Sequence, residues 1–383
     1  MIALPPIALR LPWLLFSLPA GVVTDRTNRL RLILAMDLLR ALGFVCAGLA
    51  VWLALPLPAP RAAGASAPGL FAALLACAFV IGTAEVFRDT AAQTIVPAIV
   101  DGSDLERANA RMFSAELVGN ALVGPALGAV LIAAFVWLPF ASNAFLFLLA
   151  FTLLRSLSGR FTPEPRAARD WRAELAEGIG FLKGQPFLQV LAFVTAIWNL
   201  FHQMVLIALI LHVQENLGLG PRAYGLILAA GAVGGVLGGL VAERGVRWLS
   251  AGRAAQWSSL SSAIGFGLIA LAPNGVLLAL ALVFFEFTSI FWNVVSVSYR
   301  QRVVPDAILG RVNGVYRLLS WGAMVVGLAL SGVLVRTAEA IVPREAALVA
   351  PFALAALAVL ILTLAAWKPL GRGFSQRSAA AER

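Results

Sequence analysis

The sequence contains little charge. Charged residues make up 13% of its 383 positions, against about a quarter in soluble domains. Hydrophobic residues make up 61%, and the mean hydropathy is +0.90. This composition excludes an ordinary soluble domain and places the chain in a lipid bilayer.

Cysteine and lysine are almost absent. The two cysteines, Cys46 and Cys77, lie inside apolar runs, so neither a disulfide framework nor a thiolate metal site is indicated. The only two lysines, Lys183 and Lys368, do not follow glycine, which excludes the Gly-Lys-Ser/Thr end of an ATP-binding Walker A loop. H-E-x-x-H, G-x-S-x-G and Cys/His metal spacings are also missing. We therefore expect that the protein is not an enzyme, that it binds no cofactor or metal, and that it does not use ATP directly.

Long apolar runs fill most of the chain. A transmembrane helix needs about 20 mostly apolar residues, because about 30 Å of hydrocarbon is crossed at about 1.5 Å per residue. Eleven runs meet this requirement and predict an all-α membrane protein. Their approximate bounds are 4–23, 30–54, 70–96, 110–133, 138–157, 187–213, 221–242, 254–272, 275–299, 312–335 and 345–367.

The basic residues predict the orientation. The net charge is +10, but the basic residues lie in short gaps between apolar runs, which does not fit a nucleic-acid partner. One set of alternating loops holds 22 of them, and the opposite set holds four: Arg61, Arg222, Arg336 and Arg344. Since basic loops stay in the cytoplasm, we expect a cytoplasmic C-terminus and, with eleven spans, an outward Met1.

A long cytoplasmic connection divides the chain. Residues 158–186 open with Pro163 and Pro165, after which Trp171, Leu175, Ile179 and Leu182 recur at helical spacing. This spacing predicts a short helix in the membrane interface. We predict a five-span bundle over 1–157, the linker over 158–186, a six-span bundle over 187–368 and a tail over 369–383.

The two halves share short sequence echoes. Residues 21–26 and 239–244 each read as glycine, three mostly apolar residues, an acid and an arginine. Later, Val-Pro pairs at 96–97 and 304–305 each precede an arginine and an asparagine, which are Arg107 and Asn109 in one case and Arg311 and Asn313 in the other. Parallel halves of this kind are typical of secondary transporters that hold substrate near the midplane.

The echoing segments resemble a known family. The stretch GVVTDRTNRLR over 21–31 is similar to the signature loop G-x-L-A-D-R-x-G-R-R/K of the major facilitator superfamily. Asn28 stands where glycine is usual, and asparagine also tolerates left-handed backbone. Two further runs, over 82–97 and 309–327, resemble the bacterial siderophore and macrolide exporters. The matching signature residues are Gly21, Asp25, Arg26, Arg29 and Arg31.

The resemblance implies twelve helices in two pseudo-symmetric bundles. Its signature loop follows the second helix, whereas here it follows the first predicted span. We therefore expect helix one to be missing from this chain. Either in-frame codons upstream of Met1 encode it, or the protein is a defective or specialised variant of the family. The resemblance also implies that the signature loop holds the cytoplasmic side closed; the simpler alternative is a set of positive anchors with one capping aspartate.

Polar residues inside the predicted spans are candidate site residues, because ionisable groups in a membrane are costly and usually face the protein interior. They form three stripes at helical spacing, on the spans that the resemblance places around the central cavity. The first holds Glu85, Arg88, Asp89 and Gln93, the second Thr195, Trp198, Asn199 and His202, and the third Glu286, Ser289, Asn293 and Ser296.

These stripes have simpler interpretations as well. A static ion pair between Glu85 and Arg88 explains these residues as well as transport chemistry does, and Asp37 is expected to pair with Arg40 on its own helix. His202 is also explained by a histidine that is hydrogen-bonded in the protein interior and contacts no ligand. Glu286 has no basic residue within a turn, so we predict that it carries a coupling proton, with Glu85 or Asp89 as alternatives. Arg88, Trp198, Asn199, His202 and Asn293 are the candidate substrate contacts.

A Gly-Pro run supports outward transport. Gly124, Pro125 and Gly128 resemble the antiporter motif of exporters. The simpler alternative is that they only kink the helix and serve helix packing. We therefore expect a monomeric, proton-coupled exporter of a small amphipathic compound in the inner membrane. The rivals are an importer, or a membrane sensor or scaffold with the same fold.

Overall fold

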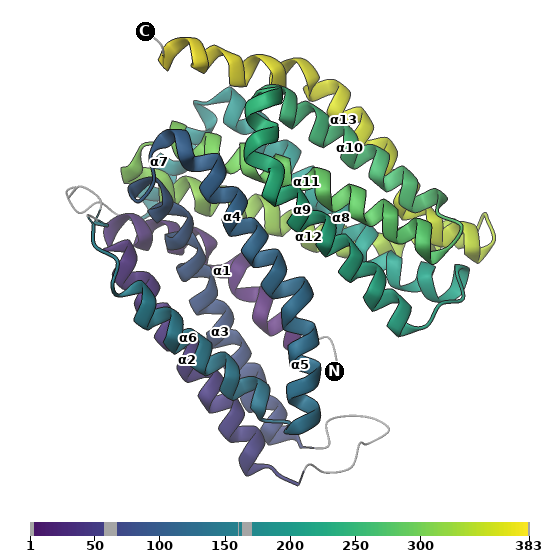
Figure 1. The fold of residues 1–383 in the computed structure, drawn as a ribbon, viewed down its shortest axis with the longest axis horizontal. Coiled ribbons are helices and arrows are strands. Elements are labelled where there is room, and N and C mark those ends of the chain that lie inside the picture. The colour runs from purple at the N-terminus through teal and green to yellow at the C-terminus, as the bar shows by residue number, and fades with distance from the viewer. Residues whose placement is uncertain (1–3, 57–66, 160, 163–170, 382–383) are drawn as a thin grey trace. The chain divides into compact units, whose positions relative to one another are not determined.

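The structure, a computed structural model, describes residues 4–56, 67–159, 161–162 and 171–381. Every regular element within these ranges is a helix (Figure 1). This follows from the composition, because a helix pairs its own backbone donors and acceptors and so needs no water in hydrocarbon.

Eight helical stretches of the described residues are long and apolar enough to cross a membrane. Each coincides with one predicted span. The remaining predicted spans, 4–23, 110–133 and 138–157, fall on other helices, so the total of eleven stays a prediction. The eight stretches are Arg29–Leu53, Pro68–Ala98, Pro186–Asn216, Pro221–Leu249, Ala251–Leu271, Gly275–Val303, Asp306–Glu339 and Arg344–Phe374.

The chain forms two compact units. Unit 1 comprises Met1–Asp101, Ala126–Phe181 and Val304–Leu318. Within it, α3 packs against both α1 and α2, and α6 packs against α2. Its helices are α1 (Leu4–Arg26), α2 (Arg29–Leu53), α3 (Pro68–Ile95), most of α5 (Gly124–Ala134), α6 (Leu138–Leu154), most of α7 (Trp171–Lys183), the short η1 (Val96–Ala98) and η5 (Asp306–Ile308), and the start of α12 (Leu309–Glu339).

Unit 2 comprises Gly102–Pro125, Leu182–Val303 and Leu319–Arg383. Here α11 packs against α9 and α10, α13 against α10 and α8, and α4 against α9. Its elements are η2 (Gly102–Asp104), α4 (Leu105–Leu117), the π-helical η3 (Val118–Val123), α8 (Pro186–Leu211), the π-helical η4 (His212–Asn216), α9 (Pro221–Leu249), α10 (Ala251–Leu271), α11 (Gly275–Val303), the rest of α12, and α13 (Arg344–Ala381).

The predicted linker helix is present as α7, whose bounds contain all four residues of its predicted apolar stripe. Its preceding prolines, Pro163 and Pro165, lie outside the described residues. Each unit takes one segment from the opposite half of the chain: unit 1 includes 304–318, and unit 2 includes 102–125. The division at residues 158–186 stays a prediction.

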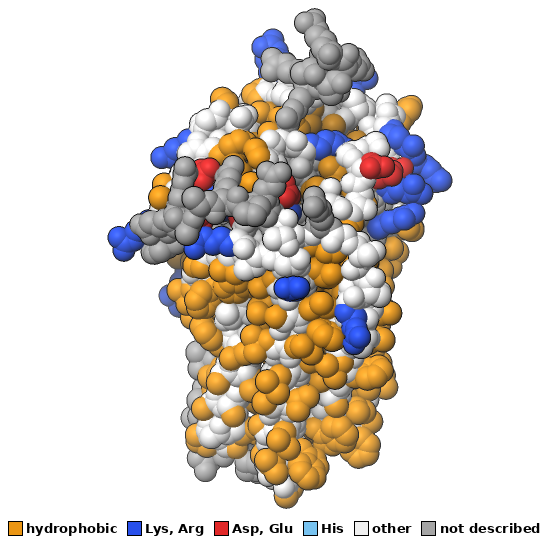
Figure 2. Space-filling view, turned by 90° about the vertical axis from the view of Figure 1, so that its left-hand side faces the viewer, with side chains coloured by type: hydrophobic (Ala, Val, Ile, Leu, Met, Phe, Trp, Pro, Cys, Tyr) orange, Lys and Arg blue, Asp and Glu red, His pale blue; other side chains and the backbone are white. Residues whose placement is uncertain are grey.

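Apolar side chains cover the outside of the helices. On α2 and α6, Leu42, Trp52, Phe145 and Leu153 each have more than half of their surface exposed. Figure 2 shows hydrophobic side chains covering a broad part of one face, with charged side chains gathered toward one end. Such an apolar surface is unfavourable in water and suits lipid.

Glycines set the spacing of α9 in unit 2. Gly235 and Gly239 lie against α4: a Cβ at Gly235 would meet Leu117, and one at Gly239 would meet Ser114. A second pair, Gly234 and Gly238, lies against α11, where a Cβ would overlap backbone carbonyl oxygens. Side chains can rotate away from a new methyl group, but a helix backbone cannot.

We therefore expect Gly238→Ala to lower thermal stability, by about 1–3 kcal/mol as for other overpacked cores. Gly225→Ala on the same helix is the control, because nothing lies within 4 Å of its Cβ position and alanine favours helix. Thermal unfolding of the purified protein in detergent measures both. Equal melting temperatures for the two variants would show that α9 and α11 are not in close backbone contact.

Candidate functional site

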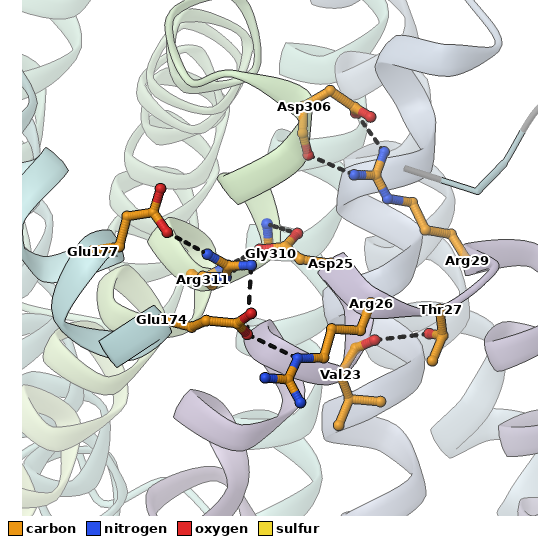
Figure 3. Close-up of polar contacts among 10 residues, drawn as sticks. All are labelled: Val23, Asp25, Arg26, Thr27, Arg29, Glu174, Glu177, Asp306, Gly310 and Arg311. Atoms are coloured by element: carbon orange, nitrogen blue, oxygen red, sulfur yellow. Dashed lines mark hydrogen bonds and ion pairs between the residues drawn. The ribbon is translucent and has the colours of Figure 1, made fainter. Parts of the chain in front are cut away.

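Asp25 lies at the end of α1, directly against the first turn of α12. Its Oδ1 accepts the backbone N–H of Gly310 at 2.8 Å, and its Oδ2 accepts that of Arg311 at 3.0 Å (Figure 3). The Asp25 side chain is fully buried. Because a helix N-terminus has unpaired N–H groups and partial positive charge, a carboxylate from another helix caps α12 here.

Three glycines permit this approach. A Cβ on Gly21 would lie 2.5 Å from the Gly310 carbonyl oxygen, and a Cβ on Gly310 would lie 2.5 Å from the Asp25 carboxylate. One turn further along, a Cβ on Gly314 would lie 2.5 Å from the Ser17 carbonyl oxygen. The two backbones are therefore in contact along this seam, and any larger residue at these positions would push Asp25 away from its donors.

Arg311 connects Asp25 to α7. Its guanidinium lies 3.4 Å from Asp25, 3.5 Å from Glu174 and 2.8 Å from Glu177. Arg26 donates to Glu174 at 2.8 Å, so two guanidiniums share that carboxylate. A Cβ on Gly178 would lie 2.9 Å from the Arg311 Cβ, which shows how closely α7 lies on α12. We call Asp25, Arg26, Glu174, Glu177 and Arg311 the Asp25 cluster (Figure 3).

Burial and hydrogen bonding oppose each other at Asp25. Burial raises the pKa of this carboxyl to about 7, while the Arg311 and Gly310 backbone donors and the Arg311 and Arg29 charges act to lower it. Ionisation of Asp25 near neutral pH therefore depends on donors that α12 supplies.

The other signature residues are used differently. Arg29 is buried and donates to Asp306, to the Asp306 carbonyl at 2.7 Å and to the Thr94 carbonyl at 3.0 Å. Arg31 is exposed. Asn28 has φ −66° and ψ 113° and accepts the Arg31 backbone N–H at 3.0 Å. It is therefore the N-cap of α2, and the left-handed backbone that asparagine tolerates is not used.

A corresponding contact lies in unit 2. Glu243, which echoes Asp25, lies 3.4 Å from Arg107 at the start of α4. Nearby, Asn109 donates to Ser298 at 3.0 Å and to Gln301 at 2.7 Å. In each half, the acid of a 21–26-like segment thus contacts the arginine that follows a Val-Pro pair: Asp25 contacts Arg311, and Glu243 contacts Arg107. The difference is that Asp25 reaches backbone N–H groups, whereas Glu243 reaches a side chain.

The acidic and basic stripe of α3 pairs across helices. Arg88 lies 3.4 Å from Asp37 of α2 and 3.3 Å from Asp89. The expected pair of Asp37 with Arg40 is wrong: Arg40 lies instead over the Phe147 ring of α6 at 4.1 Å. Glu85 is half-buried on the same helix, and its expected ion pair with Arg88 is not formed. Both predicted pairs assumed partners on one helix, whereas Asp37 finds its partner on another helix; which residues meet there depends on the register between helices, and spacing along the sequence does not give that register.

Unit 2 contains a cavity beside His202 and Glu286. Nε2 of His202 on α8 lies 3.8 Å from Oε1 of Glu286 on α11, so the acid that lacks a basic neighbour in sequence has one from another helix. The cavity has a volume of about 200 Å³ and is lined by both residues and by apolar side chains of α4 and α8–α11.

The remaining predicted contacts lie around this cavity or away from it. Trp198 stacks on His202 with centroids 4.8 Å apart. Asn199 donates to the Thr195 carbonyl of its own helix at 3.0 Å, and Asn293 is half-buried on α11. Of the four residues predicted to contact substrate on α8 and α11, His202 alone lines the cavity. Phe266 and Phe285, which also line it, were not predicted because phenylalanine is common throughout such a chain.

The Gly-Pro run follows an irregular turn. The π-helical η3, Val118–Val123, ends directly before Gly124, and Pro125 follows within α5. No atom of the described residues lies within 4 Å of a Cβ built on Gly128, and the antiporter role of this run stays a prediction. Insertion of one extra residue per turn, as in a π-helix, is a known cause of helix bending.

Comparisons of the sequence with known proteins agree with this architecture. The profile of the Major Facilitator Superfamily matches residues 6–328. The chain is 26% identical over 347 residues to the enterobactin exporter EntS of Shigella boydii serotype 18, covering 89% of this chain and 78% of EntS. EntS of Escherichia coli O81 has the same identity and coverage.

Solved structures show the same fold. A bacterial homologue of the iron transporter ferroportin, in an outward-facing state, has a TM-score of 0.72 at 16% identity and covers 96% of this chain and 90% of its own. The human organic anion transporter MFSD10 has a TM-score of 0.74 at 19% identity, and the match covers 96% of this chain and 83% of MFSD10. The E. coli fucose:proton symporter FucP has a TM-score of 0.70 at 14% identity, and the match covers 94% of this chain and 89% of FucP.

These similarities confirm the predicted fold class. Identities below 20% to the solved structures establish the architecture alone, while the family profile spans most of the sequence and includes the signature loop. The expectation that the chain is not an enzyme is confirmed by that family. The protein is an all-helical, multi-pass membrane transporter, and it belongs to the Major Facilitator Superfamily.

Proposed function

We propose that the protein exports a small amphipathic compound across the inner membrane in exchange for protons, by alternating access. Its curated relatives are named as enterobactin exporters, and Gly124-Pro125-x-x-Gly128 resembles an antiporter motif. The excess of arginine in alternate loops supports a cytoplasmic C-terminus. The moving parts are the bundles over 1–157 and 187–368, joined by the linker over 158–186, with 369–383 as the cytoplasmic tail.

The observation that carries this proposal is the cap that Asp25 places on α12. The Asp25 cluster joins a signature loop from the first half of the chain, the linker helix and a helix of the second half. Asp25, Glu174 and Arg311 of this cluster are buried, and the cluster rests on backbone contact at Gly21 and Gly310. If the two halves rock apart on the cytoplasmic side, this contact breaks, and it therefore stabilises one conformation over the other.

The linker helix adds to the same contact. Glu174 is buried and binds both Arg26 and Arg311, while Glu177 binds Arg311 from one turn further along. Charge-assisted hydrogen bonds of this kind are stronger than neutral ones. In this proposal α7 holds the closed side together, and α7 must release Arg311 when that side opens.

The coupling proton is assigned to Glu286. Its neighbour His202 is itself titratable, and both side chains keep part of their surface exposed beside a cavity. Glu85 and Asp89 are the alternatives. Arg88 already pairs with Asp89 at 3.3 Å and with Asp37 at 3.4 Å, whereas the ionisable neighbour of Glu286 is His202, which makes Glu286 the simpler proton carrier.

The direction of transport is tested in inside-out membrane vesicles. With an inward-acid gradient, an exporter accumulates its compound in such vesicles, and collapsing the gradient releases it. An importer with this fold accumulates nothing under these conditions. It accumulates its compound in right-side-out vesicles instead. Empty-vector vesicles are the control. Accumulation in right-side-out vesicles would overturn export and leave the family assignment intact.

We expect Asp25→Asn to lower transport by about tenfold or more, because a change of about 1.4 kcal/mol in the balance of two states is tenfold, and a hydrogen bond to a charged group contributes about that much. Arg31→Gln is the matched control, since Arg31 is an exposed charge of the same loop. Initial rates are divided by the amount of inserted protein. An Asp25→Asn rate equal to that of Arg31→Gln would make Asp25 a simple anchor.

Glu286→Gln is expected to abolish accumulation driven by a proton gradient and to retain exchange of compound down its own gradient, because the amide resembles the protonated acid and cannot release a proton. Asp101→Asn, which changes an exposed acid outside the Asp25 cluster, is the control. Accumulation by Glu286→Gln with unchanged pH dependence would move the proton site elsewhere, and Glu85→Gln and Asp89→Asn are then measured in the same way.

A further inference from the structure

The cavity of unit 2 has a size and lining that restrict what it can hold. Its volume of about 200 Å³ is below the roughly 300–1,000 Å³ of pockets for whole drug-sized ligands. It suits one group of one or two rings. Four helices of unit 2 and Leu117 of α4 surround it, and every lining residue except His202 and Glu286 is apolar or glycine. The cavity therefore has one polar end and an apolar remainder.

Flat rings form part of the wall. His202 and Phe285 both line the cavity, and their planes differ by 5° with centroids 5.8 Å apart. Trp198 lies beside both rings, with its centroid 4.8 Å from that of His202 and 5.8 Å from that of Phe285, and is parallel to them within 10° and 6°. Aromatic rings favour offset stacking with other rings. Phe285 is 1% exposed and its ring is already covered, so a planar group in the cavity stacks on His202, whose side chain is 23% exposed, and lies parallel to Phe285; a branched aliphatic group does not stack in this way.

The polar end carries an acid with spare hydrogen-bonding capacity. The distance of 3.8 Å between Glu286 and His202 is too long for a hydrogen bond. Their side chains are 30% and 23% exposed, so both can be reached. Gly231 lines the cavity next to the acid, and a Cβ there would already touch Leu282 Cβ at 3.3 Å and Glu286 Cγ at 3.6 Å, so the absence of a side chain keeps the acid uncovered on this side. A donor group of a ligand fits this place, and an anionic group is repelled by the carboxylate.

We propose that this cavity is a binding subsite for a planar aromatic amine of one or two rings, with the ring parallel to His202 and Phe285 and the protonated amine on Glu286. The inference rests on the proposed function, since it names the chemical class of the compound that is transported. The residue that fixes the depth of the site is Ala232, which is buried and lines the cavity. A larger side chain at this position fills the space of the ring.

Binding is measured on the purified full chain in lipid nanodiscs with two probes of equal ring size and opposite charge, 1-naphthylmethylamine and 1-naphthoate. We expect the amine to bind at least tenfold more tightly than the acid. Ala232→Leu should weaken amine binding at least tenfold. Val233→Leu is the control, because Val233 is the next residue of α9 and is 44% exposed; it should bind as the unchanged protein does.

Glu286→Gln provides a second measurement if Ala232→Leu does not fold. It removes the charge and keeps the shape, so the preference for amine over acid should fall to less than threefold. Equal binding of the two probes by the unchanged protein, or unaltered amine binding by a folded Ala232→Leu, would overturn the proposal. Displacement of the amine by a long-chain alcohol and not by naphthalene would overturn it too, and would assign the cavity to a lipid chain.

Transport separates this inference from the proposed function. If the amine binds as expected but is not carried in the vesicle assay, the subsite stands and export of this class of compound fails. If another compound is exported with a proton gradient while the amine does not bind, export stands and the aromatic amine subsite is wrong.

Discussion

Backbone contact between the end of α1 and the start of α12 is the constraint on which the Asp25 cluster depends. Gly21, Gly310 and Gly314 remove the side chains that would separate the two helices, and only then can a residue as short as aspartate reach the N–H groups of α12. Burial penalises the charge of Asp25, and the donors of α12 compensate for that penalty. The close packing of the two helices and the charge of Asp25 therefore depend on each other.

The sequence echo explains why the contact has a counterpart. Glu243, in the last third of α9, meets the start of α4 as Asp25 meets the start of α12. The two are unequal in chemistry, because Glu243 is partly exposed and shared between Arg107 and Arg247. Exposed ion pairs contribute little, so we expect the buried cap at Asp25 to dominate the balance between conformations.

Much of the fold follows from composition, and much of the site does not. Apolar runs predict helices because hydrocarbon leaves the backbone no other partner, and the signature loop singles out Asp25. Its donors could not be predicted, since they are backbone groups 285 and 286 residues away. The pairs Asp37–Arg88 and His202–Glu286 were missed for a related reason: they depend on the register between helices. Gly234 and Gly238 were missed because a glycine-rich helix offers several equivalent faces.

The central claim is that the Asp25 cap exists in one conformation and is broken in the other. Spin labels at Thr27→Cys and Pro305→Cys, with Cys46 and Cys77 replaced by serine, report the distance between the two sides of the contact by pulsed electron resonance. We predict a short and a long population in lipid, with Asp25→Asn shifting weight to the long one by about tenfold. A single unchanged distance distribution in both proteins would contradict the account.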